Sequence, residues 1–347
     1  MAKTILGVDL GNESLKLVLC KNGEVKKSAI AQVPQGLIRE GRFTSTQAVS
    51  DLIKSTMREN RIRATNAAFV LPNEICFLRT INMPVMSHEQ LKINIPYEFT
   101  DYLSEEPKNY LFDYAMLTDL KAAAHVKAEK NDADNADKAS GDKGNAMELL
   151  AVAAPSAAIE EAREALDKAG MKLVKAAPAE CALISLIRDT AKRGGGAEEY
   201  CILDVGYRAV RMYMFKGDKH MVTRVLEFGM KNVEDIIAEA MGVDVHLAHT
   251  YFISNYEDCQ NKDYCVNAYN NIAVELTRAL NFYRFNNPDS QLSDVWLCGG
   301  GVASEPLCRA ITEAMDMKVH TAGELVRGGD KLKDMQSFAV AVGATMD

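Results

Sequence analysis

The sequence lacks several features that mark common classes of protein. Its eight cysteines include no pair with CxxC spacing, so neither a zinc ribbon nor a thioredoxin-like motif is expected. No apolar run approaches the roughly 20 residues that a membrane-spanning helix needs. The N-terminal stretch MAKTILGVDLG also lacks a signal-peptide profile, because its apolar run is short and broken by Asp9. We therefore expect a cytoplasmic chain that reaches a membrane only through partners, without inserting directly.

The sequence also has no excess of basic residues. Lys and Arg number 40 against 48 Asp and Glu, which gives a formal net charge of -8. No basic stripe is interleaved with aromatic residues, so a nucleic-acid partner is not expected. The 48% hydrophobic and 25% charged residues are typical of a globular protein. At 347 residues, the chain is too long for one ordinary core, which predicts two or more domains.

What the sequence does contain is an internal repeat. Residues 4–20 read TILGVDLGNESLKLVLC and residues 200–215 read YCILDVGYRAVRMYMF. The alignment that places Asp9 on Asp204 also pairs Gly11 with Gly206, Leu15 with Val210, Lys16 with Arg211 and Lys21 with Lys216. Each copy reads as an apolar strand, a tight D-x-G turn and a second strand. The repeat therefore predicts two similar α/β lobes, each with a hairpin near its start.

The two D-x-G turns suit a phosphate-binding site. Glycine lets the backbone approach a phosphate, and successive N–H groups can cradle the anion. A carboxylate at the strand end can orient a metal-bound water, so Asp9 and Asp204 are candidate magnesium ligands. The other candidates would contact the phosphates: Gly11, Asn12, Ser14 and Lys16 in the first turn, and Gly206 in the second. The alternatives are ordinary hairpin turns and a solvent-facing lysine.

A third element follows near the C-terminal end. Residues 294–302 read DVWLCGGGV and precede a helix-like run at 303–314. A strand, three glycines and a helix let the backbone pass close to the sugar and phosphate of a nucleotide. Gly299, Gly300 and Gly301 are therefore predicted to bind the nucleoside. A tight strand–helix connection is the alternative.

Together these elements resemble those of the actin, hexokinase and Hsp70 superfamily. Within it, the sequence resembles the PilM family of actin-like type IV pilus assembly proteins, which is related to FtsA. The resemblance runs in order along almost the whole chain, through the stretches VDLGNESLKLV (8–18), VPQGLIREGR (33–42), FVLPNEICFLRTINMP (69–84), RALNFYRFNNPDSQLSDVWLCGGG (278–301) and FAVAVGATM (338–346).

This resemblance implies a duplicated, two-lobe, actin-like (ribonuclease H-like) α/β fold with an inserted 1C subdomain. It divides the chain into four subdomains: 1–33 and 149–199 (1A), 34–148 (1C), 200–222 and 295–347 (2A), and 223–294 (2B). Residues 120–146 are rich in Ala, Asp and Lys and poor in large apolar residues. They are predicted to form a flexible insert within 1C, because they cannot bury a core.

The resemblance also implies a function. The chain would be a cytoplasmic scaffold of type IV pilus assembly, or of a related secretion or competence system, that binds ATP and Mg²⁺. It would bind the N-terminal cytoplasmic peptide of a PilN-like inner-membrane protein and connect the pilus motor to the inner-membrane platform. Lys231 and Glu234 would border the nucleoside. No residue stands out as a catalytic base, so we expect at most a slow ATPase.

The second turn departs from the family pattern. Tyr207 and Arg208 follow Gly206, where the family usually has small or hydroxyl residues. The tyrosine would crowd a phosphate, whereas the arginine could supply charge. A scaffold that has lost nucleotide binding therefore stays an alternative, as do an FtsA-like filament protein and a small-molecule kinase of the same fold.

Three further patterns are interpreted as structural. His246 and His249 lie three residues apart on a predicted helix, and a surface position is favoured over metal binding. Glu180 is the polar exception on the predicted helix 178–192 and is expected on a solvated face. The aspartates from residue 132 to residue 137 lack the glycine and glutamate of an EF-hand loop, so calcium binding is not expected.

Overall fold

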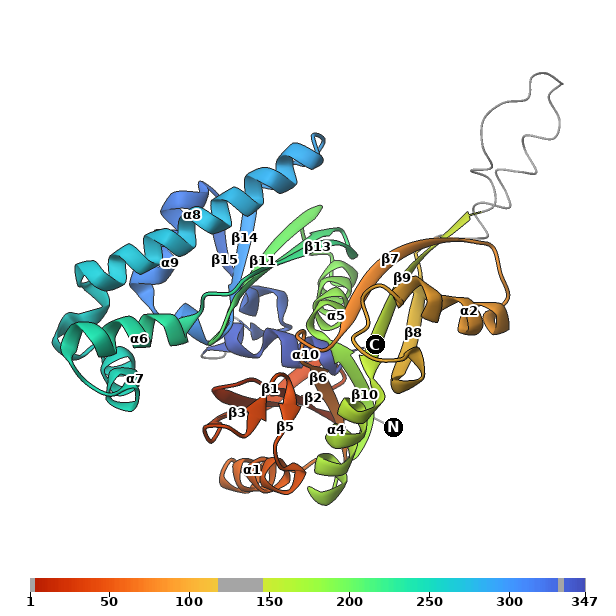
Figure 1. Cartoon of the computed structure of the whole chain (residues 1–347), viewed down its shortest axis with the longest axis horizontal. Coiled ribbons are helices and arrows are strands. Elements are labelled where there is room, and N and C mark those ends of the chain that lie inside the picture. The colour runs from red at the N-terminus through yellow and green to blue at the C-terminus, as the bar shows by residue number, and fades with distance from the viewer. Residues whose placement is uncertain (1–3, 118–145, 330–333, 347) are drawn as a thin grey trace.

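The computed structural model describes residues 4–117, 146–329 and 334–346. The predicted insert at 120–146 and the acidic run within it therefore lie outside the described residues, apart from Ala146. In the described part of the chain no helix is long and apolar enough to cross a membrane. The structure has two large sheets in separate lobes and a smaller sheet beside the first lobe (Figure 1).

The two large sheets share one topology, which confirms the predicted duplication. The first has the strand order β10-β6-β1-β2-β3 and the second β13-β12-β11-β14-β15. In each sheet three sequential strands pair antiparallel and two later strands add in parallel. The bounds in the first sheet are β1 Thr4–Leu10, β2 Ser14–Lys21, β3 Glu24–Gln32, β6 Asn66–Leu71 and β10 Lys172–Pro178. Those in the second are β11 Glu199–Val205, β12 Val210–Lys216, β13 Lys219–Leu226, β14 Asp294–Cys298 and β15 Lys318–Thr321.

Helices cover both faces of each large sheet. In the first lobe, α1 (Thr46–Glu59) and α4 (Ser156–Lys168) form the outer layer with one core cluster. Between the lobes, α5 (Ala179–Lys192) and α10 (Ala339–Ala344) share a core with both sheets. The second lobe is covered on its outer face by four helices: α6 Met230–Met241, α7 Val245–Ser254, α8 Asp263–Asn286 and α9 Glu305–Met315.

The alternation of side chains along β1 explains this layering. Ile5 points into the middle core that contains α5 and α10, whereas Leu6 and Val8 point into the outer core under α1 and α4. Successive side chains of a strand face opposite sides of the sheet. A strand that is apolar on both sides is therefore buried between two helical layers.

The third sheet is small and has the strand order β7-β9-β8. Its strands are β7 Phe77–Pro84, β8 Tyr110–Met116 and β9 Ala146–Pro155, and the helix α2 (His88–Asn94) belongs to the same subdomain. Together they surround a separate core that includes Ile81, Leu91 and Phe99. The remaining short elements are β4 Ile38–Arg39, β5 Arg42–Phe43 and 3₁₀ helices at Ile95–Phe99, Pro107–Asn109, Tyr256–Asn261, Gly300–Ala303, Ala322–Leu325 and Met335–Phe338.

The structure differs from the subdomain division expected from the sequence, because α1 falls within the expected 1C segment 34–148 but packs in the core of the first lobe. Residues 66–71 fall within the segment 34–148 that was expected to form 1C, but as β6 they lie between β1 and β10 in the first large sheet. Five of these six residues are buried, as a central parallel strand requires. The other boundaries stay a prediction.

Candidate functional site

A cavity of about 480 Å³ lies between the two large lobes. Its wall contains most of the residues that the sequence predicted to bind a nucleotide: Asp9, Gly11, Asn12, Ser14, Lys16, Asp204, Gly206, Glu234, Gly300 and Gly301. Two predicted residues, Gly299 and Lys231, do not line the cavity. Lys231 is exposed and its Nζ pairs with Asp235 at 2.6 Å. The two turns and the glycine run, which lie far apart in the sequence, thus meet around one cleft.

The first turn places a charged pair inside the cleft. The β1–β2 register sets Asp9 opposite Lys16, and Lys16 Nζ lies 3.6 Å from Asp9 Oδ2. Burial raises the pKa of Asp9, and the negative charge of Asp204 raises it further, while Lys16 opposes both effects. Burial by itself would lower the pKa of Lys16, but the two aspartates raise it overall. The lysine is therefore a charged group of the cleft, and its side chain is only 14% exposed.

The second turn repeats the backbone of the first. The N–H of Gly206 donates to the carbonyl of Ala209 at 3.0 Å, as the N–H of Gly11 donates to Ser14 at 3.0 Å. The β11–β12 register sets Asp204 opposite Arg211, which matches Asp9 and Lys16. Arg211 differs from Lys16 in its partner, because its Nη2 donates to Glu74 of the other lobe.

The three glycines after β14 have different roles. A Cβ on Gly299 would lie 2.4 Å from Asp204 Oδ1 and 2.5 Å from the carbonyl oxygen of Val205, and a Cβ on Gly301 would lie 2.4 Å from Val205 Cγ1. Gly299 also has φ +91°, which favours glycine. A Cβ on Gly300 would meet nothing within 4 Å. Close packing thus explains two of the glycines, and Gly300 presents open backbone to the cavity.

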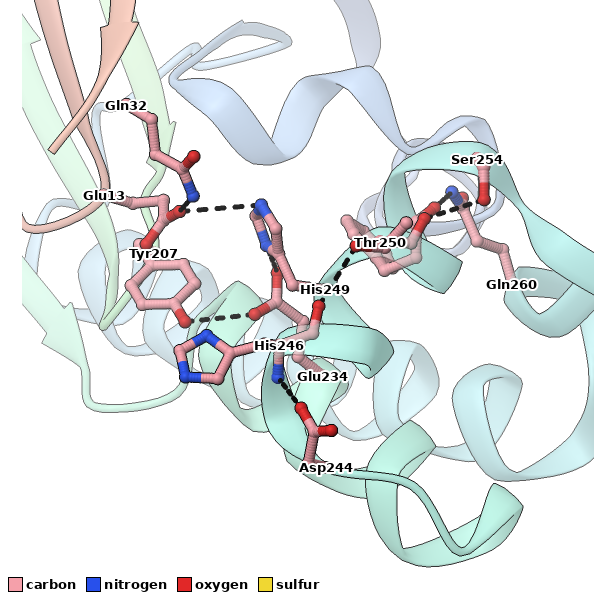
Figure 2. Close-up of polar contacts among 11 residues, drawn as sticks. Glu13, Gln32, Tyr207, Glu234, Asp244, His246, His249, Thr250, Ser254 and Gln260 are labelled. Carbon is pink, nitrogen blue, oxygen red and sulfur yellow. Dashed lines mark hydrogen bonds and ion pairs between the residues drawn. The ribbon is translucent and has the colours of Figure 1, made fainter. Parts of the chain in front are cut away.

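A polar network crosses the cleft on the side of α6 and α7 (Figure 2). Tyr207 Oη donates to Glu234 Oε2 at 3.0 Å, and His249 Nδ1 lies 2.7 Å from Glu234 Oε1. His249 Nε2 lies 3.6 Å from Glu13 Oε1 in the first lobe, and Gln32 donates to the same carboxylate at 3.2 Å. Burial raises the pKa of Glu234, whereas its bonds from His249 and Tyr207 lower it.

The expected solvated position of Glu180 was wrong, whereas the two histidines differ from each other. His246 is exposed as predicted, and His249 is partly exposed and lines the cavity. Glu180 is only 7% exposed and accepts hydrogen bonds from Asn73 Nδ2 at 3.1 Å and Thr223 Oγ1 at 3.0 Å. No local sequence pattern indicated these contacts, because the partners, such as Glu13 and His249, lie far apart in the chain.

Tyr207 and Arg208, the two unusual residues of the second turn, both lie in the cavity wall. The hydroxyl of Tyr207 is held by Glu234, so the ring is fixed toward α6. Arg208 is exposed, and its charge is available to an anion at the cavity rim.

The acidic residues fit a metal ion that binds together with a phosphate. The described residues contain no group of three or more His, Cys, Asp and Glu side chains that could hold a metal ion. Asp9 and Asp204 nevertheless face the same cavity from opposite lobes. Mg²⁺ is commonly held by one or two carboxylates, water and substrate phosphates. The pair therefore suits Mg²⁺ bound with a nucleotide, rather than a site made by protein ligands alone.

Comparison with known families gives the identification. The family model described as type IV pilus assembly protein PilM matches residues 7–131 and 134–343. The chain belongs to this family. The resemblance noted in the sequence is thereby confirmed. No curated protein matches the sequence at a significant level.

Solved structures show the same fold as this PilM family member. A structure of a PilM–PilN type IV pilus biogenesis complex has a TM-score of 0.78 at 24% identity, covering 98% of this chain and 97% of that one. The ethanolamine utilization protein EutJ from Carboxydothermus hydrogenoformans has a TM-score of 0.60 at 11% identity, covering 99% and 89%. A diol dehydratase-reactivating factor in nucleotide-free form has a TM-score of 0.56 at 12% identity, covering 98% of each chain. The predicted actin-like two-lobe fold is confirmed.

Proposed function

We propose that the chain is a nucleotide-binding scaffold of type IV pilus assembly. It binds ATP with Mg²⁺ in the interlobe cavity and binds the N-terminal cytoplasmic peptide of a PilN-like inner-membrane protein. The observation that carries the proposal is the convergence of both D-x-G turns and Gly300 on one cavity. Family membership supports the pilus-assembly role.

Each side of the cavity has a separate role in this proposal. The turns at residues 9–16 and 204–211 hold the phosphates, Lys16 neutralises part of their charge, and Asp9 and Asp204 hold Mg²⁺. The backbone of Gly300 and Gly301 borders the nucleoside opposite α6, where Glu234 lies in the wall and Lys231 at the helix start. The sequence offers no evident catalytic base, so we expect a binding protein with slow ATP turnover or none.

The partner is inferred from the family and from the solved complex that this fold matches. That structure is of a PilM–PilN complex, and the likeness extends over 98% of this chain. An extended peptide is bound by backbone pairing and by pockets for alternate side chains. Such binding would hold the chain at the inner face of the cytoplasmic membrane, where it would connect the pilus motor to the inner-membrane platform.

Calorimetry tests both parts of the proposal. ATP is titrated into the protein with Mg²⁺ or with EDTA, in the presence and absence of a synthetic peptide from the N-terminus of the PilN-like protein. We expect Mg²⁺-dependent ATP binding that weakens about tenfold or more in Asp204→Asn, because a charged ligand of the metal is lost. Asp218→Asn is the matched control, since Asp218 is exposed and pairs with Arg188.

The outcomes separate the alternatives. Peptide binding without ATP binding would support a nucleotide-free scaffold. ATP consumption that depends on a small acceptor molecule would support a kinase, and sedimentable polymers would support a filament protein. Binding of neither ligand would contradict the proposed function.

A further inference from the structure

The cation of the second hairpin is used differently from the cation of the first. Lys16 pairs within its own hairpin, 3.6 Å from Asp9. Arg211 holds the equivalent position opposite Asp204, but its Nη2 donates to Glu74 in the other lobe. The Arg211 side chain is only 14% exposed. A largely buried guanidinium thus bridges the lobes beside the predicted phosphate-binding turn.

Glu74 lies in a segment that joins two parts of the molecule. Residues 72–76 connect β6, a central strand of the first large sheet, to β7 of the three-stranded sheet. The neighbouring residue Asn73 donates to Glu180 Oε1 and to Tyr213 Oη, each at 3.1 Å. The start of the three-stranded subdomain is therefore anchored at the cavity by two adjacent side chains.

Two of the nitrogen donors of the Arg211 guanidinium make no hydrogen bond to the described residues. Within the part of the chain that the structure describes, Nε is buried and has no hydrogen-bond partner. Nη1 lies 3.7 Å from the position of a Cβ on Gly206, at the turn itself, and makes no hydrogen bond to the described residues. A buried donor without an acceptor is unfavourable. Arginine is also the side chain best shaped to bind a phosphate through parallel hydrogen bonds.

We propose that Arg211 is a phosphate-binding residue that couples the nucleotide to the three-stranded subdomain through Glu74. The inference rests on the proposed function, because it assigns a phosphate to this cavity. A phosphate oxygen at Nη1 would hold the guanidinium in the position in which Nη2 bonds to Glu74. Nucleotide binding then orders residues 72–76 and the start of β7.

Coupling of this kind is reciprocal. If the nucleotide stabilises the Arg211–Glu74 contact, any partner that binds the ordered form of the β7–β9 subdomain will increase nucleotide affinity by the same factor. The contact gives the scaffold a physical route by which an occupied cleft favours partner binding. It requires no catalytic step and no hydrolysis.

Hydrogen exchange on the full chain tests the inference. Amide exchange in residues 72–84 is measured with and without saturating ATP–Mg²⁺, and ATP affinity is measured by calorimetry. In the wild type we expect ATP–Mg²⁺ to slow exchange in this segment by about fivefold or more, within the usual range of coupling between sites. Arg211→Gln should weaken ATP binding about tenfold or more. Glu74→Gln should bind ATP within about fivefold of the wild type and lose most of the slowing in residues 72–84.

Glu106→Gln is the matched control, because Glu106 pairs with Lys108 on the exposed surface of the three-stranded subdomain. This variant should behave as the wild type in both measurements. Full slowing in Glu74→Gln, faster exchange on ATP binding, or unchanged ATP affinity in Arg211→Gln would each overturn the coupling while leaving the proposed function intact. A wild type that does not bind ATP–Mg²⁺ would overturn both.

Discussion

The two D-x-G hairpins show how one backbone can carry two different side-chain roles. Both turns close with the same hydrogen bond and set an aspartate opposite a cation. The first turn offers small polar side chains, such as Asn12 and Ser14, and its Gly11 has room for a Cβ. The second is packed tightly, since Gly229 and Gly299 approach its backbone closely. Duplication has preserved the fold while the first hairpin suits phosphate binding and the second also links the lobes.

The largest expected effect tests the tight packing behind the second hairpin. Gly299→Ala should lower the free energy of unfolding by about 3 kcal/mol or more, because it combines a strained φ with overlap against backbone atoms of Val205. Denaturant titration measures the change. Gly300→Ala is the matched control and should cost less than about 1 kcal/mol, since no atom lies within 4 Å of its Cβ. Equal losses in the two variants would contradict the packing difference.

The third antiparallel strands of the two large sheets also differ, because β13 contains His220 whereas β3 contains no histidine. Burial lowers the pKa of His220 to about 4, below the unfolded value near 6.5. The unfolded chain therefore binds the proton first as pH falls, so stability is full above pH 6.5 and is lost between pH 6.5 and 4. The loss should reach about 3 kcal/mol.

His220→Gln should flatten this part of the pH profile in denaturant titrations at several pH values. Gln can still donate to Thr223 Oγ1, which lies 2.8 Å from His220 Nε2. His246→Gln provides the comparison, because His246 is exposed, and it should leave the profile unchanged. An unaltered slope in His220→Gln would mean that another group causes the acid sensitivity.

The cation of the first hairpin should matter for ligand binding more than for folding. Lys16→Gln removes a charge that faces the cavity, and we expect ATP–Mg²⁺ to bind about tenfold or more weakly, since charge-assisted hydrogen bonds contribute about 1.5–3 kcal/mol. Lys21→Gln, at the exposed end of the same strand, should bind normally. Calorimetry measures the ATP–Mg²⁺ affinity of both variants. A wild-type affinity in Lys16→Gln would mean that Lys16 does not contact the bound nucleotide.

The smallest expected effect concerns the contact between the first turn and α7. Glu13→Gln keeps an acceptor for Gln32 but loses the charge that faces His249. Partly exposed pairs contribute less than about 1 kcal/mol, so unfolding should change little. A fluorescent ATP analogue should dissociate about twofold to fivefold faster, as followed by stopped flow. Glu24→Gln, which disrupts an exposed pair with Lys26, should not alter the rate.

The repeat was sufficient to predict two similar α/β lobes because each copy is local in the chain, and the actin-like fold class came from the resemblance to a known family. Each D-x-G hairpin lies within about 20 residues, so neighbouring residues alone indicate its two strands and its turn. The position of β6 was harder to predict, since a buried strand has the same apolar pattern whichever sheet it joins. Strand pairing over long distances depends on the whole fold, and no local pattern encodes it.

The same limit applies to the candidate site. Residues of the turns could be predicted because backbone chemistry explains them. His249, Glu74 and Asn73 were missed because their roles come from contacts between lobes. The structure also changes the interpretation of the glycine run. Gly299 and Gly301 are explained by packing against the second hairpin, and Gly300 is the member that faces open space.

A crystal structure with a non-hydrolysable ATP analogue and Mg²⁺ tests the central claim most directly. The account predicts phosphates between the turns at residues 9–16 and 204–211, and Mg²⁺ held by phosphate oxygens at about 2.1 Å. Asp9 and Asp204 should contact the ion directly or through its water ligands, with the nucleoside beside Gly300. An analogue bound outside this cavity, or an ion beyond the reach of both aspartates, would contradict the account.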